Sequence, residues 1–168
     1  QPVFPSTPFS ATAGTHKWLD LPTAAEARTT LDRIRQEVDS ASQRGEVLFM
    51  DQRQLLTYGY IPAIPFLPEY EKKYMMDQAM GANAGYFLPY YQDLQEKRFT
   101  LIVTEPLRAG IKEEGVFSEE NNAWVEWVST PTLCFYEPIM TDRLVGVQLL
   151  VPRAEAVDCQ KYLQQAAP

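Results

Sequence analysis

Two short apolar runs constrain the fold of this chain more than any other feature. Residues 47–50 (VLFM) are apolar throughout and end at an acid, Asp51, as expected of a strand buried on both faces of a parallel sheet. Residues 99–105 (FTLIVTE) are β-branched and apolar and stop at Pro106, which predicts a second strand. We expect the two strands to lie side by side at the centre of a sheet.

A helix that leads directly into the first run favours an α/β fold. It is predicted over 23–45, with Thr23 as its N-cap, Glu26 completing a capping box and Gly45 ending it. Further helices are predicted over 52–59 and 68–81, over 89–98 with Pro89 in the first turn, and from 118 onward. Strands are predicted over 133–136 and 145–151, with Pro138 and Asp142 in the loop between them.

This order of elements predicts a small three-layer, Rossmann-like α/β domain with a mixed, mainly parallel sheet and a C-terminal antiparallel strand pair. The single domain is expected over 23–153, after an extended, proline-rich lead-in over 1–22 and before a tail over 154–168. The first residue is Gln1, not Met, so we interpret the chain as a processed product or a piece of a longer one.

Composition excludes several classes of function. The formal charge of −7, with no run of Lys or Arg, argues against a nucleic-acid partner. A single histidine, His16, and two distant cysteines offer no metal site, no cofactor motif and no nucleophilic triad, so no catalytic residue is assigned. Cys134 and Cys159 are expected to be structural thiols, and one disulfide is the alternative if the compartment is oxidising.

Two acids follow the central strands and are the first candidates for a binding site. Asp51 and Glu105 stand at the C-terminal ends of the two strands, and ligands of open α/β sheets bind at that edge. The alternative, which we favour for Asp51, is an N-cap of the short helix after the strand. Tyr58 and Tyr60 lie close by in the sequence and could complete a site for a sugar or a small polar ligand.

Tyrosine and phenylalanine are dense between residues 58 and 91. The set could line a groove that faces a sugar or lipid, but we favour core and rim positions for most of it. Its members are Tyr58, Tyr60, Phe66, Tyr70, Tyr74, Tyr86, Phe87, Tyr90 and Tyr91.

The order of the motifs resembles one known family. A helix, a Gly-Glu-Val-Leu strand followed by Asp, then Leu-Leu, Tyr-Gly, a proline-broken aromatic segment, a helix, DLQEKRF and TLIV resemble the soluble C-terminal domain of bacterial membrane glycosyltransferases of the GT-C superfamily. These enzymes are relatives of the protein mannosyltransferases and use polyprenyl-phosphate sugars. The resemblance covers 23–153, continues into FSEENNAWVEWVSTPTLCFYEP and closes on GVQLLVPR.

The resemblance implies a non-catalytic accessory domain on the extracytoplasmic side of the cell membrane. In such enzymes the catalytic acid lies in the membrane part, which precedes this domain and would be its partner in the same polypeptide. The lead-in would then follow a last membrane segment, and the domain could contact the polyprenyl-phosphate sugar or the acceptor. One departure is FMDQ, which keeps only Asp51 where many relatives have a Ser-Glu-Asp triplet.

Two other classes of function remain open at this point. The first is a stand-alone extracytoplasmic module that binds a sugar or small ligand through Asp51, Glu105 and the nearby tyrosines. The second is a small hydrolase-like or nucleotide-using enzyme, which the missing nucleophile and phosphate motifs disfavour.

Overall fold

A computed structural model describes residues 21–61, 63–155 and 157–167. Nearly all of the predicted lead-in over 1–22, with His16, lies outside the described residues.

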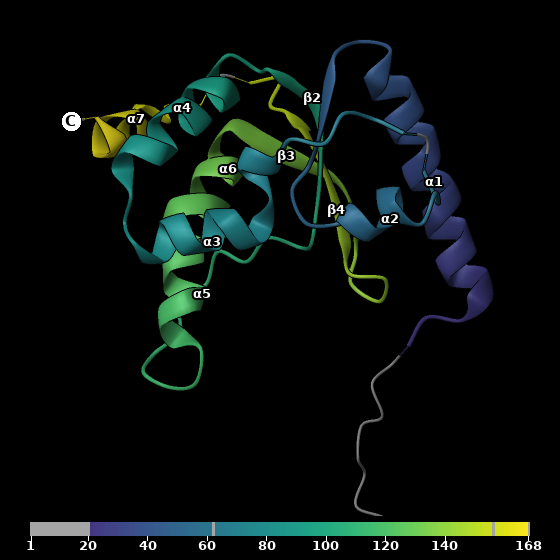
Figure 1. Cartoon of the computed structure of the whole chain (residues 1–168), viewed down its shortest axis with the longest axis horizontal. Coiled ribbons are helices and arrows are strands. Elements are labelled where there is room, and N and C mark those ends of the chain that lie inside the picture. Colours follow the sequence, from purple (N-terminus) through teal and green to yellow (C-terminus); the bar gives the residue numbers. More distant parts are fainter. Residues whose placement is uncertain (1–20, 62, 156, 168) are drawn as a thin grey trace, which may run out of the picture.

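A four-stranded mixed sheet forms the centre of the α/β domain (Figure 1). Its strands are β1 Glu46–Phe49, β2 Phe99–Thr104, β3 Tyr136–Asp142 and β4 Val147–Pro152, in the spatial order β1-β2-β4-β3. β1 and β2 are parallel neighbours, as predicted, but only β2 is central, because β1 lies at an edge of the sheet. β4 is antiparallel to both of its neighbours. The prediction of a mainly parallel sheet is therefore wrong. The reason is that β3 and β4 form a hairpin, and β4, not a third parallel strand, pairs with β2.

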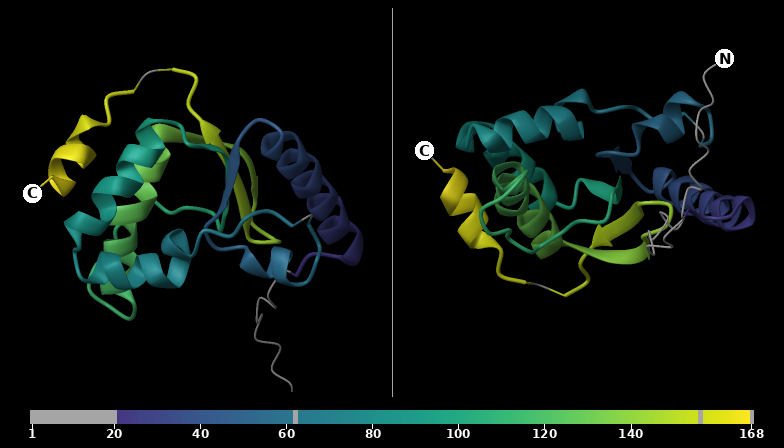
Figure 2. Two further views of the ribbon diagram at one scale, coloured as in Figure 1. Left: turned by 45° about the horizontal axis from the view of Figure 1, so that its top comes forward. Right: turned by 90° about the horizontal axis from the view of Figure 1, so that it is seen from below.

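One face of the sheet is covered by the first helix. This helix, α1 Ala24–Ser42, begins with the predicted capping box and buries the stripe formed by Ile34, Val38 and Ala41. They pack against side chains of β1, β2 and β4, together with the short helix α2 Arg53–Thr57 and the segment after it. Figure 2 shows α1 on one side of the sheet and most of the other helices on the opposite side.

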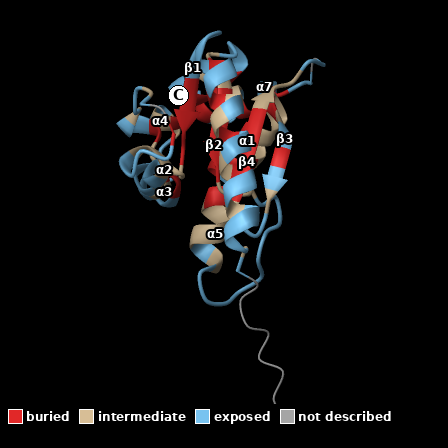
Figure 3. Ribbon diagram, turned by 90° about the vertical axis from the view of Figure 1, so that its right-hand side faces the viewer, coloured by how far each residue is buried: buried red, intermediate tan, exposed pale blue. Residues whose placement is uncertain are grey.

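The second face carries the larger core, which is rich in aromatic side chains. Its helices are η1 Pro68–Tyr70, α3 Lys72–Met80, α4 Ala84–Gln95, α5 Ser118–Trp124, α6 Thr130–Phe135 and α7 Gln160–Ala166. Tyr70, Phe87, Tyr90 and Tyr91 are buried there, so the core interpretation of these four residues is confirmed. Figure 3 shows the buried residues concentrated in β1, β2 and β4, whereas much of β3 is exposed.

Helix α4 begins earlier than the sequence indicated. Asn83 caps it by accepting a hydrogen bond from the amide of Tyr86, so the helix starts at Ala84. Pro89 consequently lies inside the helix and not in its first turn. The capping side chain fixes the start, and one interior proline does not move it.

A π-helical turn over Val125–Ser129 joins α5 to α6 without a break. Pro131 has no amide hydrogen to donate to the carbonyl of Trp127, four residues earlier. The buried hydroxyl of Tyr91 donates to that carbonyl instead, at 2.8 Å. The helical path therefore continues through Phe135, and the predicted strand over 133–136 is displaced to β3, which starts at Tyr136.

The predicted loop with Pro138 and Asp142 is in fact part of β3. A proline is tolerated there because β3 is an edge strand and its register shifts between Pro138 and Met140. Asp142 ends the strand, and its carboxylate accepts hydrogen bonds from the amides of Leu144 and Val145.

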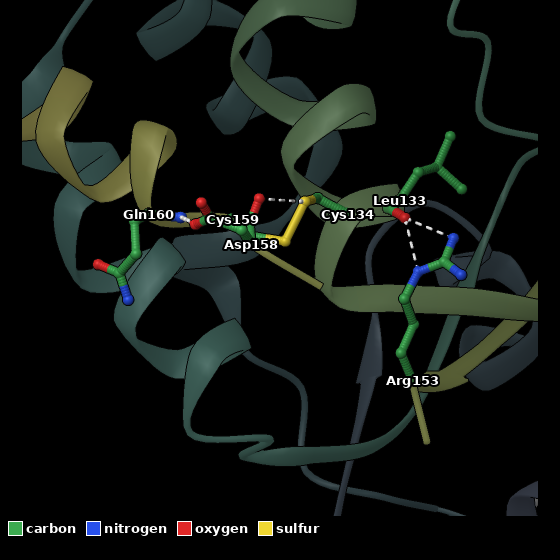
Figure 4. Close-up of a disulfide and its surroundings, with 6 residues drawn as sticks. All are labelled: Leu133, Cys134, Arg153, Asp158, Cys159 and Gln160. Atoms are coloured by element: carbon green, nitrogen blue, oxygen red, sulfur yellow. Dashed lines mark hydrogen bonds between the residues drawn. A yellow bond between two sulfur atoms is a disulfide. The ribbon is translucent and has the colours of Figure 1, made fainter. Parts of the chain in front are cut away.

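Cys134 and Cys159 form a disulfide, so the preferred prediction of two separate thiols is wrong (Figure 4). The bridge joins the end of α6 to the segment before α7, within the part predicted as a tail. Tyr162 and Ala166 of α7 are buried in the larger core. The sequence could not show the pairing because the two cysteines are 25 residues apart and meet only through the packing of α7 on α4.

Candidate functional site

The candidate site lies where β1 and β2 end and β3 turns into β4. We call this region, comprising Asp51, Glu105 and the turn over 142–146, the C-terminal edge of the sheet. The backbone brings its parts together: the amide of Lys72, at the start of α3, donates to the carbonyl of Met50 at 2.8 Å. The predicted candidates Asp51 and Glu105 do lie close together at this edge, because both contact Lys72.

Lys72 links the two acids. Its ammonium group lies 2.7 Å from a carboxylate oxygen of Glu105 and 3.4 Å from one of Asp51. The side chains of Asp51, Lys72 and Glu105 are 24%, 29% and 40% exposed, so the group is half-buried and reachable from solvent. One positive charge is thus shared by two carboxylates.

Asp51 is not a helix cap, which corrects the interpretation that the sequence favoured. The N-cap of α2 is Gln52, and its side chain makes no capping hydrogen bond. The carboxylate of Asp51 points to Lys72 instead. A partner 21 residues away in the sequence gave no local signal by which this role could have been predicted.

Two carboxylates of the edge, those of Asp51 and Asp142, have pKa values shifted in opposite directions. Burial raises the pKa of Asp51, Lys72 opposes the rise, and the neighbouring Glu105 adds to it. The pKa of Asp142 is lowered, first by the hydroxyl of Thr30, which donates to it at 2.5 Å, and then by the backbone amides of the turn. Asp142 is therefore a firmly ionised structural group, whereas Asp51 is an acid whose ionised form is less well stabilised.

Three adjoining hollows open at the C-terminal edge around Pro106. One of about 470 Å³ is lined by Glu105, Arg108, Arg143 and Gly146. A second of about 670 Å³ extends from Arg143 toward the first half of α1. The third, of about 200 Å³, extends from Glu105 toward α5 and includes Lys72 and Lys112. The edge therefore has room for a ligand and several charged groups to contact it.

Two glutamines fix the backbone around these hollows. The side-chain amide of Gln52 donates to the carbonyl of Gly146 at 2.8 Å and so crosses the end of β2. The buried Gln148 accepts from the amide of Leu107 at 3.0 Å and donates to the hydroxyl of Thr141 at 2.9 Å. Sequence analysis missed both residues, and Lys72, Arg108 and Arg143 as well. The available signal was position, since Gln52 follows the first strand and Arg108 follows the second.

Tyr58 and Tyr60, the other predicted candidates, lie at the end of α2 beside α1. Their rings pack against each other at 6.3 Å, and their side chains are 73% and 48% exposed. The carbonyl of Tyr60 accepts a hydrogen bond from Arg35 of α1. Neither tyrosine lines any of the three hollows described above, so these two form a separate exposed aromatic pair.

Within the described ranges, no cluster of three or more His, Cys, Asp or Glu side chains could hold a metal ion. The chemistry present at the edge is that of charge and hydrogen bonding. Two carboxylates are held by an ammonium group, and guanidinium groups line the hollow beside them. This arrangement is suited to recognising a polar or charged ligand.

A scan against family models, a search of curated proteins and a search of solved structures each returned no match. In the part of the chain that the structure describes, no helix has both the length and the apolar character required to span a membrane.

Proposed function

We propose that this chain is a non-catalytic, extracytoplasmic accessory domain of a membrane glycosyltransferase that uses polyprenyl-phosphate sugars. Its main partner would be the transmembrane portion of the same polypeptide. The proposal includes a small Rossmann-like, three-layer architecture, which helices on both faces of the sheet support. The family assignment rests on the resemblance in the order of the sequence motifs.

The observation that carries the location is the Cys134–Cys159 disulfide. Structural disulfides persist in secreted and periplasmic proteins and are rare in the cytosol, where thiols are kept reduced. A domain that contains one is best placed outside the cytoplasmic membrane. Thiol trapping tests this: the two cysteines should resist alkylation in the exported chain and react in the chain retained in the cytosol.

The C-terminal edge supports a binding role over a catalytic one. The carboxylates described at this edge are held by fixed partners: Asp51 and Glu105 share Lys72, and Asp142 accepts from a hydroxyl and two backbone amides. Thr30, in the first half of α1, contacts Asp142 at this edge. In a polypeptide whose membrane portion precedes α1, the edge would lie on the side from which the chain enters the domain.

The deciding experiment combines gene context with an assay. The reading frame upstream of the codon for Gln1 should encode many hydrophobic spans, and the isolated chain should transfer no sugar from a polyprenyl-phosphate donor. Membranes that contain the full polypeptide should carry the activity. An upstream region without such spans, or turnover by the isolated chain, would overturn the proposal.

The hollows at the C-terminal edge favour a second candidate, a stand-alone extracytoplasmic module that binds a sugar or a small ligand. A thermal-shift screen with saccharides separates it from the first. Stabilisation by a free saccharide in a protein whose gene lacks membrane spans would favour the module. If no saccharide raised the melting temperature of the chain, this second candidate would lose its support.

A further inference from the structure

We infer that the C-terminal edge contains an anion site for a phosphate or diphosphate group, formed by Arg108 and Arg143. Both arginines line the hollow of about 470 Å³ between the loop after β2 and the β3–β4 turn. No ion pair or hydrogen bond engages either guanidinium group among the residues that the structure describes. Arg98 and Arg153, in contrast, are held by carboxylates or carbonyls.

Charge at this hollow is opposite in sign to that of the whole chain. The formal charge of the chain is −7, yet the hollow of about 470 Å³ is lined by two guanidinium groups, those of Arg108 and Arg143, and by one carboxylate, that of Glu105. The adjoining hollow adds the cations Lys72 and Lys112 and one further acid, Glu120. Two of the acids nearby are engaged by other groups. Glu105 pairs with Lys72 at 2.7 Å, and Asp142 accepts from Thr30 and from two backbone amides. The charge left for a ligand is positive.

The backbone beneath both arginines is anchored. Arg108 follows Leu107, whose amide is held by Gln148, and Arg143 follows Asp142, whose carboxylate is held inside the turn. Gln52 fixes the same turn from the β1 side through Gly146. Guanidinium groups on a fixed backbone lose less freedom on binding, and their planar fork matches the oxygens of phosphate. The edge itself is where open α/β sheets bind ligands.

The ligand chemistry is a phosphate ester or diphosphate, which could come from a lipid-linked sugar or from a free anion. The lipid source rests on the proposed function, whereas the anion site rests only on the geometry of the hollow. Glu105 stands at the rim of the same hollow and could accept from a sugar hydroxyl beside the phosphate. A free inorganic diphosphate would use the arginines alone.

Isothermal titration of the disulfide-bonded chain with inorganic diphosphate tests the site at constant ionic strength. Loss of one charge-assisted hydrogen-bonding partner weakens binding by about tenfold, so Arg108→Ala with Arg143→Ala should weaken it by about a hundredfold. Arg44→Ala is the matched control, because Arg44 is exposed after α1, away from this edge. It should bind within about twofold of wild type.

Two results would overturn the site: no diphosphate binding by wild type, or an equal loss in the Arg44 control, which would mean non-specific attraction. Thermal denaturation of each variant verifies that the exposed substitutions leave the fold intact. A parallel titration with a short, soluble polyprenyl phosphate separates the sources. Tighter binding of that ester than of phosphate supports a lipid-linked ligand, and equal binding assigns a free anion to the site. The gene context tests the proposed function separately.

Discussion

The two ends of the β1–β2 pair are built from similar parts and behave differently. At each end one cation lies between two carboxylates that belong to different elements. At the N-terminal end Arg98 contacts Glu46 at 3.0 Å and Asp93 at 2.7 Å. At the C-terminal end Lys72 contacts Glu105 at 2.7 Å and Asp51 at 3.4 Å.

The difference lies in how completely the charges are satisfied. Arg98 donates from three nitrogens, and Asp93 also accepts from the hydroxyl of Tyr70 at 2.6 Å. The hydrogen bonds that Arg98 makes, first with Glu46 and then with Asp93, raise its pKa above the ordinary range. The pKa of Asp51 is raised, because burial outweighs the single shared ammonium group. A guanidinium makes a fixed network, whereas an ammonium leaves its partners partly unsatisfied.

The N-terminal edge is also cross-linked by other contacts. Arg153 donates twice to the carbonyl of Leu133, Lys97 donates to the carbonyl of Arg153, and the disulfide joins the adjacent helices (Figure 4). Hollows of about 270 Å³ beside Arg153 and about 220 Å³ beside Glu46 lie at this edge. The two larger ones at the C-terminal edge measure about 470 and 670 Å³. The N-terminal end is therefore the more strongly cross-linked, and the larger hollows lie at the C-terminal end.

Of the substitutions considered, removal of the disulfide at the N-terminal end should reduce stability most. Replacing Cys134 and Cys159 together by Ala should lower the free energy of unfolding by about 3 kcal/mol, because the unfolded chain is no longer cross-linked. Chemical denaturation of oxidised wild type and the variant measures the loss. Reduced wild type is the control and should match the variant. Equal stability of all three would show that the bridge contributes nothing.

Removing Arg98 should come next. Arg98→Met leaves Asp93 and Glu46 without their cation and should cost about 2 kcal/mol, since hydrogen bonds to charged groups are the strong ones. Urea unfolding measures the change, with Arg44→Met as the exposed control. A loss no greater than that of the control would contradict the comparison between the two ends.

Removing Lys72 should have a smaller effect on stability. Lys72→Met at the C-terminal edge is expected to cost about 1 kcal/mol or less, because the group is more open and only one close contact is lost. The same urea experiment applies. A loss of stability equal to that of Arg98→Met would mean that the two cations stabilise the fold equally, which would contradict the comparison.

The smallest effects should be two pH dependences of opposite sign, each under about 1 kcal/mol. The folded pKa of Asp51 is raised above its ordinary value of 3.8, so ionisation costs stability as pH rises from about 4 through the folded pKa. The folded pKa of Asp142 is lowered below 3.8, so its contribution is present above that value and lost as pH falls through the folded pKa.

Asp51→Asn should therefore gain on wild type as pH rises from 4, and Asp142→Asn should gain on it as pH falls below 4. Thermal denaturation from pH 2.5 to 6 compares each variant with wild type. Slopes of the same sign for the two variants would contradict the assignment of different environments to these acids.

Local signals in the sequence were enough for part of the fold. The capping box at Thr23 and Glu26 fixed the start of α1, and the two apolar runs located β1 and β2 within a residue or two. Asp51 and Glu105 could be placed at one edge because parallel strands end on the same side. In each case the deciding interaction is between near neighbours or follows from strand direction.

The other features of the fold and the site depend on contacts between residues that are distant in the sequence, which no local pattern predicts. Tyr91 satisfies the carbonyl freed by Pro131, and this extends a helix across residues with strand-like composition. Asp51 pairs with Lys72 instead of capping α2 as expected, although the two residues are far apart in the chain. The arginines of the proposed anion site become neighbours only because a hairpin turn lies beside the loop after β2.

The strand order has a consequence for the time course of folding. β1 ends at Phe49 and pairs with β2, which begins at Phe99, and β2 must then wait for β4, which begins at Val147. Domains dominated by such distant pairings fold more slowly than those with local contacts. The edge of β2 that pairs with β4 therefore stays unpaired until residues up to Pro152 have been synthesised. The four-stranded sheet can be completed only after the β3–β4 hairpin has been synthesised.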